Sequence, residues 1–289
     1  MNLKLEDKTA LVTGSTAGIG LAIALGLARE GARVVVNGRT QARVDAALAR
    51  IRREVPQAKA EGVALDLGTA AGCEALVRRL PSVDVLVNNL GIFEPKPFEQ
   101  IPDADWQRLF EVNVMSGVRL SRAYLSGMKQ RNWGRIVFIS SESAVQIPAE
   151  MVHYGVTKTA QVAVARGIAE TCAGTAVTVN SVLAGPTASE GVVIFVATLA
   201  KEQGTTPQEF EKQFFRDVRP SSLLKRFIKP EEVAALVVFV CSPEASAING
   251  AALRAVRIED IASDQGGCTK FENAVDHDAE GTLFDNRQR

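Results

Sequence analysis

Short, almost uninterrupted apolar runs alternate with longer segments of helical periodicity over most of this chain. Runs such as 34–36 (Val-Val-Val) and 136–139 (Ile-Val-Phe-Ile) lack the polar–apolar alternation of a strand with one wet face. Such strands must be covered on both faces, which is typical of parallel sheets joined by helical crossovers. The predicted strands are 9–13, 33–37, 62–66, 83–88, 135–140 and 176–182, and the predicted helices lie near 18–30, 40–54, 70–80, 103–130 and 151–173.

This repeated strand–helix order predicts an α/β fold of the Rossmann type: a doubly wound parallel sheet with helices on both faces. We expect one domain over 1–256. An insertion at 188–229 separates the sixth strand from a helix that begins near Pro230. Residues 257–289 carry eight acidic against four basic residues and few apolar ones, so we expect an atypical, loosely attached polar tail.

Charge and cysteine usage narrow the function classes. The chain of 289 residues has 33 basic and 33 acidic side chains, so nothing favours nucleic acid or an anionic membrane as a partner. The longest apolar stretch, 192–200, is too short to span a bilayer, and the start lacks the apolar core of a signal peptide. Four widely spaced cysteines predict neither disulfides nor a metal site. We therefore expect a cytoplasmic protein without a metal.

A glycine-rich loop follows the first predicted strand and opens the first helix. In the run 13–20 (Thr-Gly-Ser-Thr-Ala-Gly-Ile-Gly), Gly14 permits a tight turn, Gly18 allows backbone to approach a pyrophosphate, and Gly20 permits close packing. The helix N-terminus would then present free N–H groups to the phosphates. Glycines alone mark many turns, but this position in a strand–helix series predicts a dinucleotide site. Its cofactor-binding candidates are Gly14, Ser15, Gly18, Ile19 and Gly20.

The end of the second strand indicates which dinucleotide binds. A carboxylate there would bind the 2′-hydroxyl of NAD and repel a 2′-phosphate. The chain instead has Asn37 and Arg39, and an arginine can make charge-assisted bonds to a phosphate. We therefore predict NADP as the cofactor, with NAD as the alternative. The simpler interpretation of Arg39 is a solvated arginine at a strand end.

Polar or small residues also follow the third and fourth strands. Because the carboxyl ends of parallel strands meet at one edge of the sheet, these residues are expected to face the same crevice. Asp66 and Leu67 would lie near the adenine, and Asn89, Leu90 and Gly91 would supply backbone beside the nicotinamide ribose. Taken singly, each of them could equally be turn chemistry.

A tyrosine and a lysine four residues apart predict the chemistry. Tyr154 and Lys158 would share one face of a helix, with Ser141 just past the fifth strand and Asn113 in the preceding long helix. Reduction of a carbonyl requires a proton donor for the forming alkoxide, which a phenol can provide. Ser141 would hold the substrate oxygen. Asn113 could hold a water that relays protons to Lys158.

The phenol needs help to work near neutral pH. A free tyrosine has a pKa of about 10, roughly three units too high, which is about 4 kcal/mol. One ammonium at roughly 4 Å supplies about 4 kcal/mol at an effective dielectric constant near 20. We therefore expect Lys158 to lower the pKa of Tyr154. A tyrosine–lysine pair at this spacing is common by chance; its place after the glycine loop makes it a catalytic candidate.

Together these residues resemble the short-chain dehydrogenase/reductase family in its single-domain form. The resemblance runs from about Leu5 to Leu253 and includes the glycine loop, 88–91, 179–181 and the four catalytic candidates. It implies a tetrad of Asn113, Ser141, Tyr154 and Lys158, a seven-stranded sheet, a small carbonyl or alcohol substrate and a homo-oligomer, either a tetramer or a dimer. It further implies that Gly185 and Thr187 approach the nicotinamide carboxamide.

The sequence also departs from the family pattern. Leu90 stands where alanine is usual, Ala184-Gly185 replaces Pro-Gly, and the usual Asp-Gly-Gly ending is absent after Leu253. The family resemblance identifies 188–229 as a substrate lid. Five phenylalanines in the lid favour an apolar or mixed substrate, unless they merely anchor the lid's own helices; they are Phe195, Phe210, Phe214, Phe215 and Phe227.

Three functional interpretations compete. Among enzymes, the chain resembles the 3-oxoacyl-[acyl-carrier-protein] reductases, although Thr175 stands where these usually carry a carrier-docking arginine; Lys129 and Arg131 could compensate. A catalytically silent nucleotide sensor or scaffold would not need the intact tetrad. A sugar-nucleotide epimerase would have a different glycine spacing and a separate substrate domain. We therefore predict an NADP-dependent oxidoreductase that interconverts a carbonyl and a secondary alcohol.

Overall fold

The computed structural model describes residues 2–202 and 204–255, so the expectations for 257–289 lie outside the described residues. Seven strands form one parallel sheet in the order β3-β2-β1-β4-β5-β6-β7, which confirms the predicted Rossmann-type fold. The chain reverses direction across the sheet between β1 and β4, where ligands bind in open sheets of this kind. The strands are β1 (Thr9–Val12), β2 (Arg33–Gly38), β3 (Ala60–Ala64), β4 (Val85–Asn88), β5 (Gly134–Ser141), β6 (Val177–Ala184) and β7 (Ala252–Arg254).

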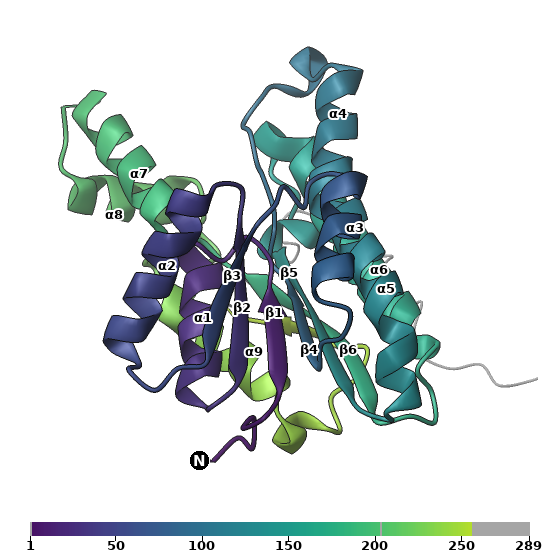
Figure 1. Cartoon of the computed structure of the whole chain (residues 1–289). Coiled ribbons are helices and arrows are strands. Elements are labelled where there is room, and N and C mark those ends of the chain that lie inside the picture. Colours follow the sequence, from purple (N-terminus) through teal and green to yellow (C-terminus); the bar gives the residue numbers. More distant parts are fainter. Residues whose placement is uncertain (1, 203, 256–289) are drawn as a thin grey trace, which may run out of the picture.

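Helices cover both faces of the sheet (Figure 1). The apolar cores on the two faces are separate, one built with α1, α2 and α9 and the other with α3, α5 and α6. The longer helices are α1 (Gly18–Arg29), α2 (Gln41–Glu54), α3 (Ala70–Arg79), α4 (Asp103–Phe110), α5 (Ser116–Gln130), α6 (Val152–Glu170), α7 (Glu190–Glu202), α8 (Pro207–Asp217) and α9 (Pro230–Val240). None of the helices in the described part of the chain is long and apolar enough to cross a membrane.

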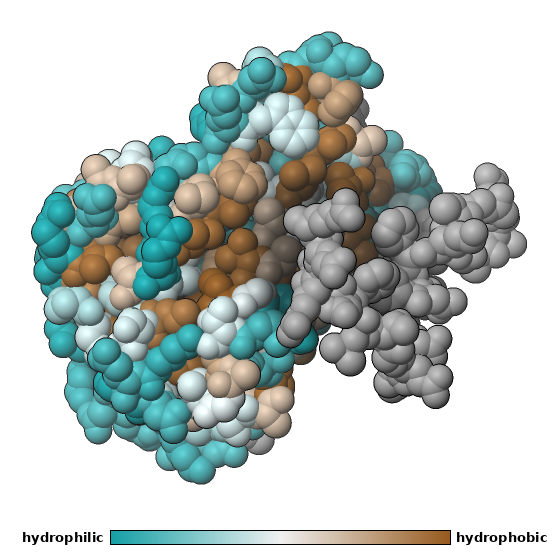
Figure 2. Space-filling model, turned by 90° about the vertical axis from the view of Figure 1, so that its right-hand side faces the viewer, coloured by the Kyte–Doolittle hydropathy of each residue, from teal (hydrophilic) through white to brown (hydrophobic). Residues whose placement is uncertain are grey.

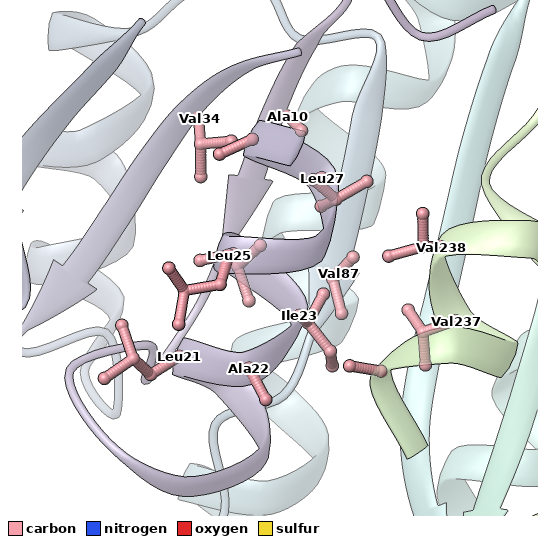
Figure 3. Close-up of a cluster of buried hydrophobic side chains, with 14 of the residues drawn as sticks. Ala10, Leu21, Ala22, Ile23, Leu25, Leu27, Val34, Val87, Val237 and Val238 are labelled. Atoms are coloured by element: carbon pink, nitrogen blue, oxygen red, sulfur yellow. The ribbon is translucent and has the colours of Figure 1, made fainter. Parts of the chain in front are cut away.

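The first of these cores fixes the helix that carries the glycine loop. Figure 3 shows side chains of α1 between the strands and α9, with Ile23 and Leu27 pointing toward Val87, Val237 and Val238. All five are buried. This packing holds the N-terminus of α1 against the carboxyl ends of the strands, which is where the predicted dinucleotide site lies.

Two elements differ from the sequence-based prediction. β3 ends at Ala64, and Asp66 lies in a turn, because its carboxylate accepts the N–H of Gly68 at 3.0 Å. The predicted helix 103–130 is divided by a π-helix at Glu111–Met115. In this wider turn the N–H of Ser116 donates to the carbonyl of Glu111, five residues earlier.

The lid segment, residues 188–229, contains α7 and α8, which project from one end of the sheet (Figure 1). A parallel bridge between Thr187 and Ile228 closes its base. Within the lid, the rings of Phe214, Phe215 and Phe227 contact one another at centroid distances of 5.1–5.3 Å. These three rings form the lid's own small core, so they are not an indication of an apolar substrate.

Candidate active site

The loop between β1 and α1 turns at two glycines. Gly14 and Gly18 have φ angles of +59° and +54°, a region that residues with a Cβ rarely adopt. α1 begins at Gly18, and its N-cap residue, Ala17, makes no side-chain hydrogen bond to the first turn. The N–H groups of that turn, at Gly18, Ile19 and Gly20, are therefore available to an anion such as a phosphate.

Position 20 must be glycine because any side chain there would clash with the glycine loop. A Cβ at Gly20 would lie 2.6 Å from the carbonyl oxygen of Gly14 and 2.9 Å from the Cα of Ser15, and closer still to the side-chain amide of Asn89. The first two are backbone atoms that cannot move without deforming the loop. Gly20 thus keeps the helix close to the residues that end β1 and β4.

Asn37, predicted to face the adenosine ribose, instead has its side chain turned into the protein. Its Oδ1 accepts the N–H of Gly14 at 3.2 Å, and its Nδ2 donates to the carbonyls of Val63 and Leu65 at 3.1 and 3.0 Å. The buried hydroxyl of Ser15 accepts the N–H of Asn37 at 2.9 Å. Both polar side chains therefore support the loop from behind, and their predicted contact with the cofactor stays a prediction.

Three other candidates lie at the ends of β2 and β3. Arg39 is exposed and forms no ion pair or hydrogen bond with another residue in the described part of the chain. Asp66 is exposed too, at the turn after β3. Leu67 is only 1% exposed and packs in the core, so that only its backbone can face a ligand.

Thr13 links the glycine loop to the loop after β4, a role that sequence analysis missed. Its hydroxyl accepts the N–H groups of Asn89 and Leu90, each at 2.9 Å. In return, Nδ2 of Asn89 donates to the carbonyls of Thr13 and Gly14 at 2.9 and 3.0 Å. The signal in the sequence was a hydroxyl residue placed between a buried strand and the first glycine.

The four catalytic candidates gather at the carboxyl ends of β4 and β5. A Cβ at Gly91 would lie 3.5 Å from Nζ of Lys158 and 3.6 Å from Oδ1 of Asn113. Nζ of Lys158 lies 5.5 Å from the centre of the Tyr154 ring, and the phenol is hydrogen-bonded to Ser141. The fold thus brings together residues that are separated by up to 67 positions in the sequence.

The pKa values of Tyr154 and Lys158 differ from those expected from the sequence. Burial raises the pKa of Tyr154 to about 12, even though its hydrogen bond with Ser141 lowers it in part. Burial also lowers the pKa of Lys158 to about 8. In this chain alone, burial and the nearby Glu142 raise the phenol pKa, so the expected lowering by Lys158 is not seen and stays a prediction for the enzyme with its cofactor.

Asn113 is hydrogen-bonded to protein groups through both its side chain and its main chain. Its side chain accepts the N–H of Ile92 at 2.8 Å and donates to the carbonyl of Ile92 and the hydroxyl of Thr157. Its main-chain carbonyl accepts Nε2 of Gln161 at 2.6 Å. The side chain of Gln161, which sequence analysis did not identify, links this carbonyl to Lys158, and the relay water stays a prediction.

Glu142, directly after Ser141, is a further residue that the sequence did not reveal. It is buried, and its Oε1 accepts Nε of Arg219 from the lid at 3.1 Å. Burial raises the pKa of Glu142 to about 7, against the opposing effect of Arg219. The catalytic end of β5 and the lid are thus joined by a charge pair shielded from water.

Gly185 and Thr187, the last two candidates, lie where the lid begins. Both are buried, and the hydroxyl of Thr187 donates to the carbonyl of Gly185 at 2.8 Å. The lid also approaches the glycine loop, since a Cβ at Gly18 would lie 3.1 Å from Cβ of Ser189. The lid base therefore borders both the phosphate end and the catalytic end of the site.

The residues present fit a nicotinamide dinucleotide. The glycine turn leaves uncapped N–H groups at one end, and at the other end Gly91, without a side chain, lies next to Lys158 and Asn113. The sheet is all-parallel, and its strand order changes direction between β1 and β4. Together these features define a nicotinamide-dependent oxidoreductase acting on alcohols or carbonyls.

Comparison with known proteins gives the family. Residues 8–199 match the family model described as short chain dehydrogenase, so the chain belongs to this family. The chain is 50% identical to the "Uncharacterized oxidoreductase YvaG" of Bacillus subtilis over 255 residues, covering 88% of this chain and 97% of the relative. It is 34% identical to the D-beta-hydroxybutyrate dehydrogenase of Cupriavidus necator over 251 residues, covering 86% and 95%.

A similar solved structure is that of L-sorbose reductase from Gluconobacter frateurii, complexed with NADPH and L-sorbose. Its TM-score is 0.82 at 31% identity, with 88% of this chain and 97% of that chain covered. The 3-oxoacyl-[acyl-carrier-protein] reductase of Aquifex aeolicus is 34% identical over 254 residues, covering 86% of this chain and 96% of the relative.

Proposed function

We propose that this protein is an NADP-dependent oxidoreductase that interconverts a small carbonyl compound and its secondary alcohol. The observation that carries the proposal is the cluster of Tyr154, Lys158, Ser141 and Asn113 beside Gly91, at the end of the sheet where the glycine loop lies. When bound, the nicotinamide supplies or accepts the hydride. The residues of the chain handle the proton and the charge on oxygen.

The proton moves at the hydroxyl of Tyr154. With a pKa raised to about 12 by burial, the phenol is protonated at neutral pH and is ready to donate to a forming alkoxide. Ser141 orients the substrate oxygen, and a cationic Lys158 stabilises the phenolate that remains. A protonated phenol is the state that carbonyl reduction requires, because the phenol then donates its proton to the substrate oxygen.

The preference for NADP rests on Arg39. No carboxylate ends β2, and Arg39 is exposed without an ion-pair partner in the described residues. A free guanidinium at this position suits a 2′-phosphate. The NADPH bound by L-sorbose reductase is consistent with this choice.

Carrier-protein docking has weaker support than a free small substrate. Lys129, which could compensate for Thr175, donates to the carbonyl of Thr171 at the end of α6. Arg131 donates to the carbonyl of Val83 at 2.8 Å. Both cations are thus engaged by their own chain, so we favour a free ketone over an acyl chain on a carrier.

The silent-sensor alternative is tested by removing one oxygen. Tyr154→Phe should lower kcat by about 10²–10⁴-fold, the usual contribution of general acid catalysis, and leave the Kd for NADPH within a few-fold. Tyr124→Phe is the matched control, because its hydroxyl donates to the carbonyl of Leu80 away from the site. The measurement is NADPH oxidation over aldehydes, ketones, keto-sugars and 3-oxoacyl thioesters. Undiminished turnover by Tyr154→Phe would exclude its acid role; no turnover by the wild type would favour the sensor.

The cofactor assignment is tested by reversing the charge at β2. Arg39→Asp should raise the Kd for NADPH about 10–100-fold, the loss expected for charge-assisted bonds, and leave NADH binding unchanged or tighter. Arg52→Asp, an exposed arginine near the far end of α2, makes the same charge change away from the site. Equal effects of the two variants on NADPH binding would rule out a specific role for Arg39.

We further propose a single domain whose lid segment covers the substrate, in a homo-oligomer of two or four subunits. Figure 2 shows apolar surface across the middle of one face of the molecule, bordered by hydrophilic residues. Phe110 on α4 and Val156 on α6 are large apolar side chains that stay exposed in one chain. Sedimentation at several protein concentrations measures the oligomeric state directly.

A further inference from the structure

A buried amide connects the catalytic lysine to the π-helix. Nζ of Lys158 donates to Oε1 of Gln161 at 3.1 Å, and Nε2 of Gln161 donates to the main-chain carbonyl of Asn113 at 2.6 Å. Gln161 is 1% exposed, so water does not compete for these bonds. One side chain thus spans the distance between two residues of the proposed tetrad.

The orientation of this amide is determined by its partners. An ammonium can only donate, and a carbonyl oxygen can only accept. Therefore Oε1 of Gln161 must face Lys158 and Nε2 must face Asn113. A flipped amide would place two donors together and two acceptors together, which is costly in a buried site.

The carbonyl of Asn113 is available because the helix is widened there. The N–H of Ser116 reaches back to the carbonyl of Glu111, while the hydroxyl of Ser116 satisfies the carbonyl of Val112 at 2.6 Å. The next carbonyl, that of Asn113, accepts the amide of Gln161. The π-helix and Gln161 are thus complementary parts of one arrangement.

Gln161 also governs the surroundings of the lysine charge. The two acceptors that hold the ammonium, the carbonyl of Ile139 at 2.9 Å and Oε1 of Gln161, are both neutral. The titratable groups near it are Tyr154 on the same helix and Glu142 after β5, which acts on Tyr154. From the segment after β4 and the π-helix, Gly91 and Asn113 present uncharged groups.

We propose that Gln161 is a positioning residue that keeps Lys158 charged and directed at Tyr154, in the place where sequence analysis expected a relay water. This inference rests on the proposed function for its catalytic meaning. Two of the three ammonium protons are held by Ile139 and Gln161, which leaves the third for the tyrosine or the cofactor ribose.

The test alters the amide in two opposite ways in the full-length protein. Gln161→Leu removes the acceptor, so Lys158 should lose its proton at a pH lower by about one unit, the size of one hydrogen bond to a charged group. Gln161→Glu places a carboxylate beside the ammonium and should raise that pH by at least as much. The readout is NMR of ¹³Cε-labelled lysine, with the Lys158 signal assigned by its loss in Lys158→Met.

Turnover provides the second readout. At neutral pH Gln161→Leu should lower kcat at least twofold with little change in KM, because about half of Lys158 would lose its charge, and acidification should restore that part of the loss. The pH profile of Gln161→Glu should move in the opposite direction. If Gln161 had a purely structural role, both substitutions would lower the stability of the protein and leave the pH dependence of kcat unchanged.

Asn180→Leu is the matched control. Asn180 is also a fully buried amide, and it bonds to Ile248 and Ala251 beside β7. Its loss should lower the melting temperature without moving the Lys158 titration. If the Lys158 titration is the same in wild type, Gln161→Leu and Gln161→Glu, the inference is wrong. If it moves but no carbonyl is turned over by the wild type, the inference stands and the proposed function fails.

Discussion

The glycine loop and the lid segment border the same site but are held in opposite ways. The loop is fixed by a network of buried polar bonds in which Thr13, Asn37 and Asn89 tie it to the ends of the neighbouring strands. The lid is joined to the rest by its base at Thr187, by Arg219, and by exposed pairs of Arg50 with Glu190 and of Arg226 with Glu232.

This difference separates rigidity from adaptability. The phosphate end must present backbone N–H groups at fixed positions, so a small displacement there removes several bonds at once. The lid has its own aromatic core in Phe214, Phe215 and Phe227, so it can move or open locally without exposing the core of the sheet. A site that binds a cofactor and a substrate is expected to combine a rigid loop for the cofactor with an adaptable segment for the substrate.

The largest expected effect on cofactor binding comes from adding one methyl group to the loop. Gly20→Ala would place a Cβ 2.6 Å from the carbonyl of Gly14, so the loop must shift and NADPH binding should fall at least 100-fold, with a loss of about 3 kcal/mol of stability. Thermal unfolding and NADPH fluorescence titration measure the two effects.

The same substitution in the lid is the control. Gly191, in the first turn of α7, has nothing within 4 Å of the added Cβ. Gly191→Ala should therefore change stability by less than about 1 kcal/mol, in the stabilising direction, and leave NADPH binding unchanged. Similar losses in the two variants would show that the loop and the lid do not differ as described.

The glycine loop was the part of the candidate site that was most predictable from sequence. Positive φ at Gly14 and Gly18 demands glycine, and the strand–helix order locates the loop at the edge of the sheet. The inward turn of Asn37 was not predictable, because the same amide could bind a ribose or three backbone groups. Only the positions of Val63 and Leu65 decide between these roles.

The second prediction compares two buried phenylalanines. Phe138 lies in the core under α5, where a Cβ at Gly117 would already touch its ring, whereas Phe215 lies in the lid core. Phe138→Ala should lower the global free energy of unfolding by about 3–5 kcal/mol. Phe215→Ala should lower it by less than about 1 kcal/mol, because the lid can open separately.

Hydrogen exchange followed by mass spectrometry locates the effect. In Phe215→Ala, faster exchange should be confined to the lid segment, while β1, β4 and β5 stay protected. If exchange rises equally in the sheet, the lid folds as one unit with the domain and the comparison fails.

The candidate catalytic residues were predicted one by one, and the structure brings them together, but the contacts that connect them were not predicted. The spacing of Tyr154 and Lys158 indicates a pair on a helix, and that follows from helix geometry. The π-helix, the role of Gln161 and the burial of Glu142 depend on contacts between elements far apart in sequence. The pKa of Tyr154 could not be foreseen for the same reason, since burial is a property of the assembled fold.

The smallest expected effect concerns the charge pair that joins the two regions. Glu142 has a pKa raised by burial to about 7, above its ordinary value of 4.5. The folded state therefore holds this proton more tightly than the unfolded state, so Glu142 makes the protein less stable as pH rises from about 4.5 to about 7. The full shift corresponds to about 3 kcal/mol, and about 2 kcal/mol is expected after solvent screening.

Glu142→Gln should remove this dependence while its amide oxygen still accepts the bond from Arg219. Relative to wild type, the variant should gain about 2 kcal/mol between pH 5 and pH 8, measured by urea unfolding at each pH. Arg219→Met should do the opposite, because it leaves the buried carboxylate without its counter-charge and steepens the loss of stability above pH 5. Parallel stability curves for wild type and Glu142→Gln would mean that water reaches this carboxylate, and that the lid contacts the end of β5 less closely than the bond between Glu142 and Arg219 implies.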